Sequence, residues 1–364
     1  MQILYDDQIF SFMEFGGISK YFCELMDYYH SNNIPYELGL KYSNNQHLKS
    51  LTFIKQKAFC KDIKFPRKGL MIHFFNHPAI IKKLLKNEYD IFHPTYFNPY
   101  FLKYNGKKPF VLTVYDMIPE IFGDESFLGK LLIKNKKTLI YEADKIIAIS
   151  ENTKKDILKF YSLDEDKIEV IHIGIKKREV PINTKIPIPE KYLLFVGNRE
   201  GYKNFSFLIH SISPILKERA DLFFVCAGSS KFSEAEIELF SGLKISDKIL
   251  HYPANSAILP IFYRKALCFI FPSKYEGFGI PIIEAFSEGC PVILSNTSSF
   301  PEIAGSAGLY FNPDDQTSLK ECVCGLLDDD KLSIKLKLDG LQKAKEFTSE
   351  IMAKKTLNIY YSII

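Results

Sequence analysis

One stretch of the sequence combines the residue types that bind a phosphorylated ligand. Cys268–Phe271 is apolar and predicts a short buried strand. A turn with Gly277 and Gly279 follows, and Pro281 stands where a helix can begin, because its missing N–H costs nothing there. Such a turn presents unpaired backbone N–H groups and the positive end of the helix, which together bind phosphate or diphosphate.

Two carboxylates frame this glycine turn. Glu276 stands directly before it, and Glu284 is expected in the first turn of the following helix. Ionised carboxylates accept hydrogen bonds, so they can bind sugar hydroxyls while the backbone amides hold phosphate. The stretch therefore predicts a pocket for a nucleotide-sugar.

A second group of charged residues follows another predicted strand, which ends at Gly197. Arg199 and Lys203 come from the loop after this strand. Two cations beside a helix N-terminus would neutralise a diphosphate and stabilise it as a leaving group. Asn204 is a candidate cap for the next helix. Either cation alone would be ordinary surface charge, and the combination with Glu276 and Glu284 supports the pocket.

Alternating strands and helices must position these residues. Apolar strand patterns recur along the whole chain with helical segments between them, which predicts an α/β fold with parallel, doubly wound sheets. The expected strands are 1–5, 34–40, 89–94, 110–116, 145–150 and 168–173, then 192–197, 222–227, 249–252, 268–271, 291–295 and 308–311.

A charged, proline-punctuated segment, Lys176–Lys191, interrupts the pattern and predicts a linker between two domains. The expected domains are 1–180 and 181–347, with 348–364 packing back on the first. Ligands of such sheets bind at the carboxyl edges of the strands, so we expect the site in a cleft between the two domains. Residues 41–88 show no clear period, and residues 331–364 are predicted to be helical.

With these motifs in order, the chain resembles a retaining glycosyltransferase of the GT-B fold, in family 4 of the glycosyltransferases. The nearest resemblance is to bacterial mannosyltransferases that build O-antigen or capsule polysaccharide. It implies two Rossmann-like domains that face each other across a cleft, with a C-terminal helix returning to the first. The matching segments are Gly16–Ser19, Tyr115–Pro119, Ser150–Thr153, Ile173–Gly174, Val196–Asn198, Lys203–Asn204, Glu276–Ala285 and Pro301–Glu302.

The resemblance also implies roles for individual residues. Glu284 would bind the ribose hydroxyls of the donor, and Glu276 the transferred sugar. Arg199 and Lys203 would bind the diphosphate, and Gly17 would lie against it from the other domain. The full set of implied donor-binding residues is Gly16, Gly17, Arg199, Lys203, Ser273, Gly277, Phe278, Gly279, Ile280 and Glu284.

The chain departs from the family pattern at the edge of the first domain. Many relatives have histidine directly before the aspartate, whereas this chain has Tyr115 before Asp116. Asp116 becomes the catalytic candidate beside Glu276, either as a base towards the acceptor hydroxyl or as a group that orients the substrate. Tyr115 and His93 are further acceptor-side candidates, although a structural role is the favoured interpretation for His93.

No cofactor and no metal ion are expected, and the resemblance implies that Arg and Lys replace a metal. Asp328–Asp330 contains a D-x-D pattern, but it falls between two predicted helices, which favours a solvated turn. The seven cysteines lack metal-ligand spacing and are expected to be free thiols in a reducing cytoplasm.

The region from Lys41 to Phe110 is strongly basic, with fourteen Lys and Arg residues against three acids and with aromatic residues interleaved. This composition favours peripheral contact with an anionic membrane. Nucleic acid is not expected, because no nucleic-acid-binding motif accompanies the charge. Neither a signal peptide nor an apolar run of about 20 residues is present, so we expect a cytoplasmic protein on the inner face of the plasma membrane.

The resemblance implies transfer of a hexose with retention to a hydroxyl of a lipid-linked or growing glycan acceptor. Mannose or a related sugar from a GDP-sugar is the favoured donor, and a UDP-sugar is the alternative on the same fold. Two other hypotheses stay open. The first is a sugar-nucleotide epimerase or a phosphorylase, and the second is a non-catalytic scaffold, which intact Arg199, Lys203, Glu276 and Glu284 argue against.

Overall fold

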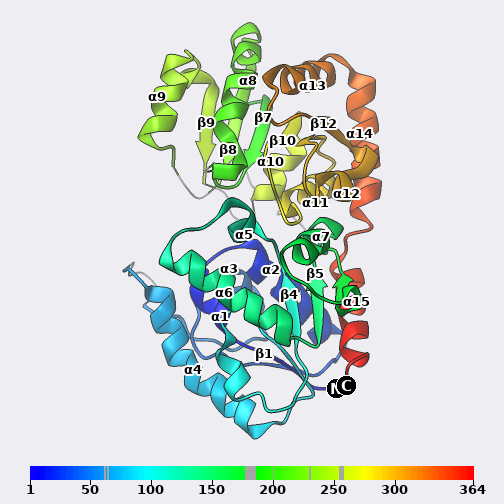
Figure 1. The fold of residues 1–364 in the computed structure, drawn as a ribbon. Coiled ribbons are helices and arrows are strands. Elements are labelled where there is room, and N and C mark those ends of the chain that lie inside the picture. Colours follow the sequence, from blue (N-terminus) through cyan, green and yellow to red (C-terminus); the bar gives the residue numbers. More distant parts are fainter. Residues whose placement is uncertain (61–62, 64, 177–185, 200, 229–230, 254–257) are drawn as a thin grey trace. The chain divides into compact units, whose positions relative to one another are not determined.

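The structure is a computed structural model that describes residues 1–60, 63, 65–176, 186–199, 201–228, 231–253 and 258–364. The chain forms two compact units. Unit 1 comprises Met1–Lys176 and Thr348–Ile364, and unit 2 comprises Lys177–Phe347. Most of the predicted linker, residues 177–185, lies outside the described residues. Each unit is built around parallel strands with helices between them (Figure 1).

The described residues of unit 1 form six short strands, all in parallel pairs. They form two three-stranded sheets with the orders β2-β1-β3 and β4-β5-β6, and a bridge between Phe92 and Phe110 joins β3 to the start of β4. After β2 the chain adds its next strand, β3, on the opposite side of β1, so the strand order reverses between β1 and β3. Open α/β sheets bind ligands at such a place. The strands are β1 (Ile3–Tyr5), β2 (Tyr36–Leu38), β3 (Ile91–His93), β4 (Val111–Val114), β5 (Lys145–Ala148) and β6 (Ile168–Val170).

The helices of unit 1 include one that the sequence pattern did not reveal. It is α4 (Lys68–Lys86), which fills much of the unassigned region 41–88 and contains Pro78. Its buried positions Ile72, Asn76, Ile80 and Leu84 follow a four-residue spacing along one face. The other helices are α1 (Gln8–Phe12), α2 (Gly17–Ser31), α3 (Gln46–Lys49), α5 (Ile118–Phe122), α6 (Phe127–Glu142), α7 (Glu151–Phe160) and α15 (Ser349–Tyr361).

The C-terminal helix α15 belongs to unit 1, as predicted, and packs on α2. The prediction of continuous helix over 331–364 is wrong, because Lys345–Thr348 separates α14 from α15. At this point Thr348 forms a parallel bridge with Ile175, and the backbone of Thr348 lies so close to Gly174 that no Cβ could fit there. The two places where the chain passes between the units are therefore neighbours.

Where the structure describes unit 2, its strands form a six-stranded parallel sheet with the order β12-β11-β10-β7-β8-β9. Successive strands run outward in both directions from the central pair β7 and β10, which is the order of a doubly wound dinucleotide-binding sheet. The strands are β7 (Lys191–Val196), β8 (Leu222–Ala227), β9 (Ile249–Tyr252), β10 (Cys268–Phe271), β11 (Val292–Ser295) and β12 (Gly308–Phe311).

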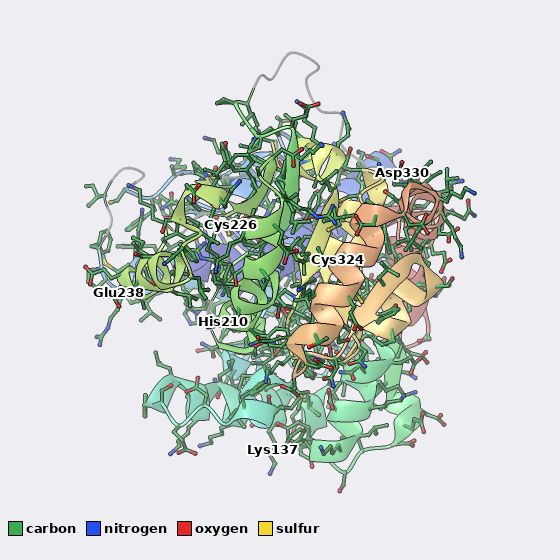
Figure 2. All side chains as sticks on the ribbon, turned by 90° about the horizontal axis from the view of Figure 1, so that it is seen from above. Lys137, His210, Cys226, Glu238, Cys324 and Asp330 are labelled. Carbon is green, nitrogen blue, oxygen red and sulfur yellow. The ribbon has the colours of Figure 1, made fainter. Side chains whose placement is uncertain are left out.

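Helices cover this sheet and close an apolar core. Cys226, labelled in Figure 2, lies in this core with Phe195, Leu208, Phe224 and Ile270. The sequence between the strands 249–252 and 268–271 also predicts a helix at about 256–266, of which residues 256–257 lie outside the described residues. The helices are α8 (Phe205–Glu218), α9 (Glu234–Gly242), α10 (Leu259–Lys265), α11 (Ile280–Ser287), α12 (Phe300–Ala304), α13 (Gln316–Asp328) and α14 (Asp330–Ala344). No helix in the described ranges is both long and apolar enough to cross a bilayer.

Candidate active site

The switch point of the unit 2 sheet brings the two predicted ligand-binding loops together. The loop after β7 and the donor turn, defined as residues 272–279 after β10, leave the sheet from neighbouring parallel strands. The Lys274 N–H donates to the carbonyl of Tyr202 over 2.8 Å and joins the two loops directly. The ligand crevice of such a sheet lies at this point.

Gly279 allows the donor turn to enter helix α11. Its φ is +97°, a left-handed conformation that side chains disfavour. A Cβ atom there would lie 2.9 Å from Ile282 Cδ1 and 3.1 Å from Phe300 Cε1. The helix begins at Ile280 with Pro281 in its first turn, as the sequence predicts. The local sequence thus places a helix N-terminus at the crevice, where it favours anions.

Lys203 and Glu276 form an ion pair, with 2.6 Å between Lys203 Nζ and Glu276 Oε1. Only 16% and 12% of the two side chains are exposed, so solvent screens the pair less than a surface one. Lys203 also lies 5.5 Å from the ring centre of Phe271. The predicted diphosphate cation and the predicted sugar-binding carboxylate therefore meet at one place.

Arg199 does not join this ion pair and instead contacts α9 and the segment before it. Its Nε donates to Glu236 Oε1 on α9 over 2.6 Å, and its Nη2 donates to the carbonyl of Lys231 over 2.7 Å. The guanidinium also lies 4.9 Å from the ring centre of Phe232. These contacts direct the charge of Arg199 towards α9, and its predicted contact with a diphosphate stays a prediction.

Three other predicted residues lie near the crevice. Glu284 on α11 is half-buried and accepts a hydrogen bond from the Tyr263 hydroxyl over 3.3 Å. Ser273 is fully buried, and its hydroxyl has no hydrogen-bond partner in the described part of the chain. Asn204 occupies the N-cap position of α8, as proposed from the sequence, but its side chain makes no capping hydrogen bond. Its backbone is left-handed and its side chain donates to the carbonyl of Pro313 over 3.0 Å.

The glycine pair of unit 1 begins a long helix. Gly17 is the first residue of α2, which runs for 15 residues. Gly16 is extended, with φ 168°, and its carbonyl accepts a hydrogen bond from the Ser19 hydroxyl over 2.9 Å. The N-terminus of α2 can therefore bind an anion.

Asp116 lies two residues beyond the end of β4 and is held in a fixed loop. Its carboxylate accepts a hydrogen bond from the Ile118 N–H over 3.0 Å. Its carbonyl accepts one over 3.1 Å from Lys136, whose ammonium is also 2.9 Å from Glu120. The Lys136 and Glu120 side chains are only 1% and 3% exposed. This buried ion pair fixes the backbone that carries Asp116.

Tyr115 directly precedes Asp116, and its side chain is buried with its hydroxyl unpartnered within the described residues. Burial raises the pKa of the Tyr115 phenol well above its ordinary value. The Tyr96 pKa is also raised, first by burial and then by the charge of Asp116. Two tyrosines thus surround the aspartate at the carboxyl edge of β3 and β4.

His93 lies inside the core of unit 1 and not at a solvent-facing site. Its Nδ1 is 2.6 Å from the Tyr360 hydroxyl of α15, and its Nε2 is 2.9 Å from the Thr113 hydroxyl. Tyr5 and Tyr21 extend this network through the same two hydroxyls. The structural role that the sequence favoured accounts for these contacts, since both ring nitrogens are occupied.

His93 should make unit 1 sensitive to acid. Burial lowers the His93 pKa to about 3, whereas an unfolded histidine titrates near 6.5. Between these values only the unfolded state binds the proton, so stability should fall as the pH falls, by up to about 1.4 kcal/mol per pH unit. Hydrogen exchange of β3 and β4 at pH 7 and pH 5, corrected for intrinsic rates, measures this loss. Equal pH dependence in wild type and His93→Gln would contradict it.

Among the residues that the structure describes, no group of three or more His, Cys, Asp or Glu side chains is arranged to hold a metal ion. The D-x-D pattern forms the junction of α13 and α14, where Asp328 pairs with Arg219 and Asp329 caps α14. Asp330 lies at this junction, at the periphery of unit 2 (Figure 2). All three side chains are exposed, as a solvated turn requires.

Sequence reasoning missed the hydroxyl-rich segment Ser295–Ser299, which contacts the donor turn. It joins β11 to α12, and β11 pairs with β10, so both segments leave the same edge of the sheet. The available signal was a run of hydroxyl residues at the carboxyl end of the strand next to the glycine turn. No sequence pattern indicated that Arg199 pairs with Glu236, because the two residues are far apart in the sequence.

Two family models account for most of the chain. "Glycosyltransferase Family 4" matches residues 15–179, and "Glycosyl transferases group 1" matches residues 176–342. The fold and the two matches define a GT-B glycosyltransferase, built from two Rossmann-like domains. The chain belongs to family 4 of the glycosyltransferases.

Curated relatives include O-antigen enzymes. The chain is 32% identical to the O-antigen chain mannosyltransferase RfbU of Salmonella typhimurium over 215 residues, which are 58% of this chain and 59% of the relative. It is 27% identical to the O-antigen chain mannosyltransferase B of Escherichia coli over 59% of this chain and 60% of the relative. The matched region thus spans about three fifths of these relatives.

Solved structures share the fold over the whole chain. A glycosyltransferase from Rickettsia africae superposes with a TM-score of 0.75 at 22% identity, over 100% of this chain and 98% of that one. The Anabaena protein HepE, solved in complex with UDP, gives a TM-score of 0.75 at 16% identity over 100% of both chains.

Proposed function

We propose that the protein is a retaining glycosyltransferase that moves a hexose to a hydroxyl of a lipid-linked or oligosaccharide acceptor in surface polysaccharide synthesis. Mannose from GDP-mannose is the favoured donor, because the curated relatives RfbU and O-antigen chain mannosyltransferase B are named mannosyltransferases. The observation that carries the proposal is the Lys203–Glu276 ion pair at the switch point of the unit 2 sheet.

In the proposed reaction Lys203 neutralises the diphosphate as it leaves, in place of a metal ion. Glu276 binds the transferred sugar, Glu284 binds the ribose, and the amides at the start of α11 hold phosphate. Arg199 pairs with Glu236 on α9, whereas Lys203 pairs with Glu276 of the donor turn itself, so Lys203 is the stronger candidate. No carboxylate is an obvious nucleophile, and we propose same-face displacement in which the leaving diphosphate helps to deprotonate the acceptor.

Two measurements test this function. The first is thermal unfolding with GDP, UDP, ADP and dTDP, where the preferred nucleotide at a hundredfold excess over its dissociation constant should add about 2.7 kcal/mol of stability. The second incubates labelled GDP-mannose with and without a lipid-linked glycan. Transfer only with acceptor supports the proposal. Consumption of the donor without acceptor would indicate an epimerase, and binding without turnover would indicate a scaffold.

A UDP-sugar is the second candidate donor, since the Anabaena protein of the same fold was solved with UDP. The same nucleotide panel separates the two. Selective stabilisation by UDP would replace GDP-mannose in the proposal without changing the class of reaction.

Asp116→Asn should lower the rate of transfer on the order of 10²–10⁴ if Asp116 is the base towards the acceptor. The amide keeps an oxygen for the Ile118 N–H, so the loop should stay folded. Asp124→Asn is the matched control, because the Asp124 carboxylate accepts the Ser126 N–H over 3.0 Å in the same type of turn. Rates are compared at saturating donor. An Asp116→Asn enzyme as fast as the control would leave Asp116 no role in the reaction.

We also propose that unit 1 contacts the inner face of the plasma membrane through α4. The N-terminal half of this helix exposes Leu70, Met71, Phe74 and Phe75, with Phe74 73% exposed. Basic residues accompany them at Arg67, Lys68, Lys82, Lys83 and Lys86. Exposed aromatic residues on a basic helix suit an anionic lipid surface.

Replacing Leu70 and Phe74 together by serine should reduce sedimentation with vesicles of phosphatidylcholine and anionic lipid at least tenfold, because apolar burial at the surface is lost. Ile237→Ser is the control, since Ile237 on α9 is 54% exposed. A second pair, Phe127→Ser with Leu128→Ser on α6, tests the other exposed apolar group. Loss of binding only in the α6 pair would contradict the role of α4.

A further inference from the structure

The hydroxyl-rich segment Ser295–Ser299 makes side-chain hydrogen bonds along the backbone of the donor turn. Two of them fix the start of the turn. The Ser295 hydroxyl donates to the carbonyl of Ser273 over 2.5 Å, and the Thr297 hydroxyl donates to the carbonyl of Lys274 over 3.1 Å. Because these bonds join two different strand ends, they tie the turn to the rigid sheet.

Two further serines hold Glu276 itself. The Ser298 hydroxyl accepts a hydrogen bond from the Glu276 N–H over 3.1 Å. The Ser299 hydroxyl is 2.9 Å from the carbonyl of Glu276 and 3.0 Å from that of Phe278, so its one proton is shared between the two. The backbone of Glu276 is therefore bound on both sides, while its carboxylate pairs with Lys203.

The geometry of these serines is specific. Ser299 is fully buried, and Ser298 has a φ of +51°. Non-glycine residues rarely adopt this left-handed conformation, because it crowds the Cβ atom. Strained positions of this kind persist where the surrounding structure holds them, often at functional sites. Here the strained residue is the one that reaches the Glu276 amide.

We propose that Ser298 and Ser299 are positioning residues of the transferase site. They fix the Glu276 backbone so that its carboxylate stays beside Lys203 in the free protein. When the donor diphosphate binds Lys203, the Lys203–Glu276 ion pair is replaced, and the same fixed backbone presents the Glu276 carboxylate to the donor sugar. This inference rests on the proposed function, and it adds two residues that act through Glu276 without touching the substrate.

The central variant is Ser299→Ala, with Ser287→Ala as the matched control. Ser287 lies on α11 and donates to the carbonyl of Ile283 over 2.7 Å, so it makes the same kind of bond without contacting the donor turn. Hydrogen exchange at residues 274–279 should become about tenfold faster in Ser299→Ala and stay unchanged in Ser287→Ala, since a buried hydrogen bond is lost only in the first.

Activity gives a second, independent measurement. Ser299→Ala should lower kcat on the order of tenfold while the affinity for the free nucleoside diphosphate stays within about twofold, because Lys203 and Glu284 are intact. In a Glu276→Gln background the added substitution should have no further effect, since Ser299 acts through Glu276. Ser298→Gly removes the other hydroxyl and relieves the backbone, so it folds even if Ser299→Ala does not, and it should show the same pattern.

Unchanged exchange of the donor turn in both serine variants would overturn the inference. An equal loss of rate with and without the Glu276 carboxylate would overturn it as well. If the wild-type protein transfers no sugar from any donor, the proposed function fails, and hydrogen exchange still decides whether the serines hold the turn.

Discussion

Lys203→Ala should lower the rate of sugar transfer on the order of 10²–10³, the cost of removing one charge that stabilises a developing anion. The alanine variant cannot neutralise the leaving diphosphate, and it leaves Glu276 without its 2.6 Å partner. Transfer is measured at saturating donor and acceptor, and nucleoside diphosphate affinity is measured separately. Both should fall, with the larger effect on kcat.

Lys274→Ala is the control for this experiment. Lys274 lies in the donor turn and also forms an ion pair, 2.7 Å from Asp314, but the two side chains are 46% and 72% exposed. Exposed pairs contribute little, so this variant should keep nearly the wild-type rate. The double variant Lys203→Ala with Glu276→Gln shows how much of the lost transfer rate comes from leaving the Glu276 carboxylate without its partner. A full transfer rate in Lys203→Ala would refute the diphosphate role.

Ending the chain at Phe347 should abolish the folding of unit 1. This truncation removes α15, whose side chains Met352, Ala353, Leu357 and Tyr360 are buried. Each large apolar side chain contributes roughly 1.5–3 kcal/mol when buried, so their sum approaches the 5–15 kcal/mol that stabilises a whole domain. Removal of the Tyr360 hydroxyl also leaves His93 Nδ1 unpaired in the core.

Circular dichroism and limited proteolysis measure this effect. The matched truncation removes only Ser362–Ile364, which follow the end of α15, and it should leave the unfolding temperature nearly unchanged. A chain ending at Phe347 that unfolded at the wild-type temperature would show that unit 1 is stable without α15.

The sequence predicted the strands well because each is a short apolar run between turn residues. Cys268–Phe271 and Leu222–Ala227 were placed at their observed bounds. Helix α4 escaped prediction for physical reasons. Its N-cap residue Arg67 is left-handed and makes no capping bond, and Pro78 stands inside it. Tertiary packing of residues such as Asn76, which binds the backbone of Tyr42, stabilises this helix and leaves no local signal.

The position of a candidate site residue was predictable where the residue lies in the loop that follows a strand. Lys203 and Glu276 follow strands that pair at the centre of the sheet, so their loops had to meet. The orientation of Arg199 was not predictable, since Glu236 and Phe232 compete for it from another element. The hydroxyl contacts of Ser298 and Ser299 depend on a loop conformation that composition does not encode.

The bridge between Ile175 and Thr348 has a consequence for how such enzymes diversify. Because the chain leaves and re-enters unit 1 at adjacent residues, everything between them is topologically an insertion with neighbouring ends. Recombination at these two points would exchange unit 2 as a cassette while α15 and the unit 1 core remain whole. Gly174, whose contact with Thr348 tolerates no side chain, marks one boundary of that cassette. A chimera that carries residues 177–347 of a relative should therefore fold and take the donor of that relative.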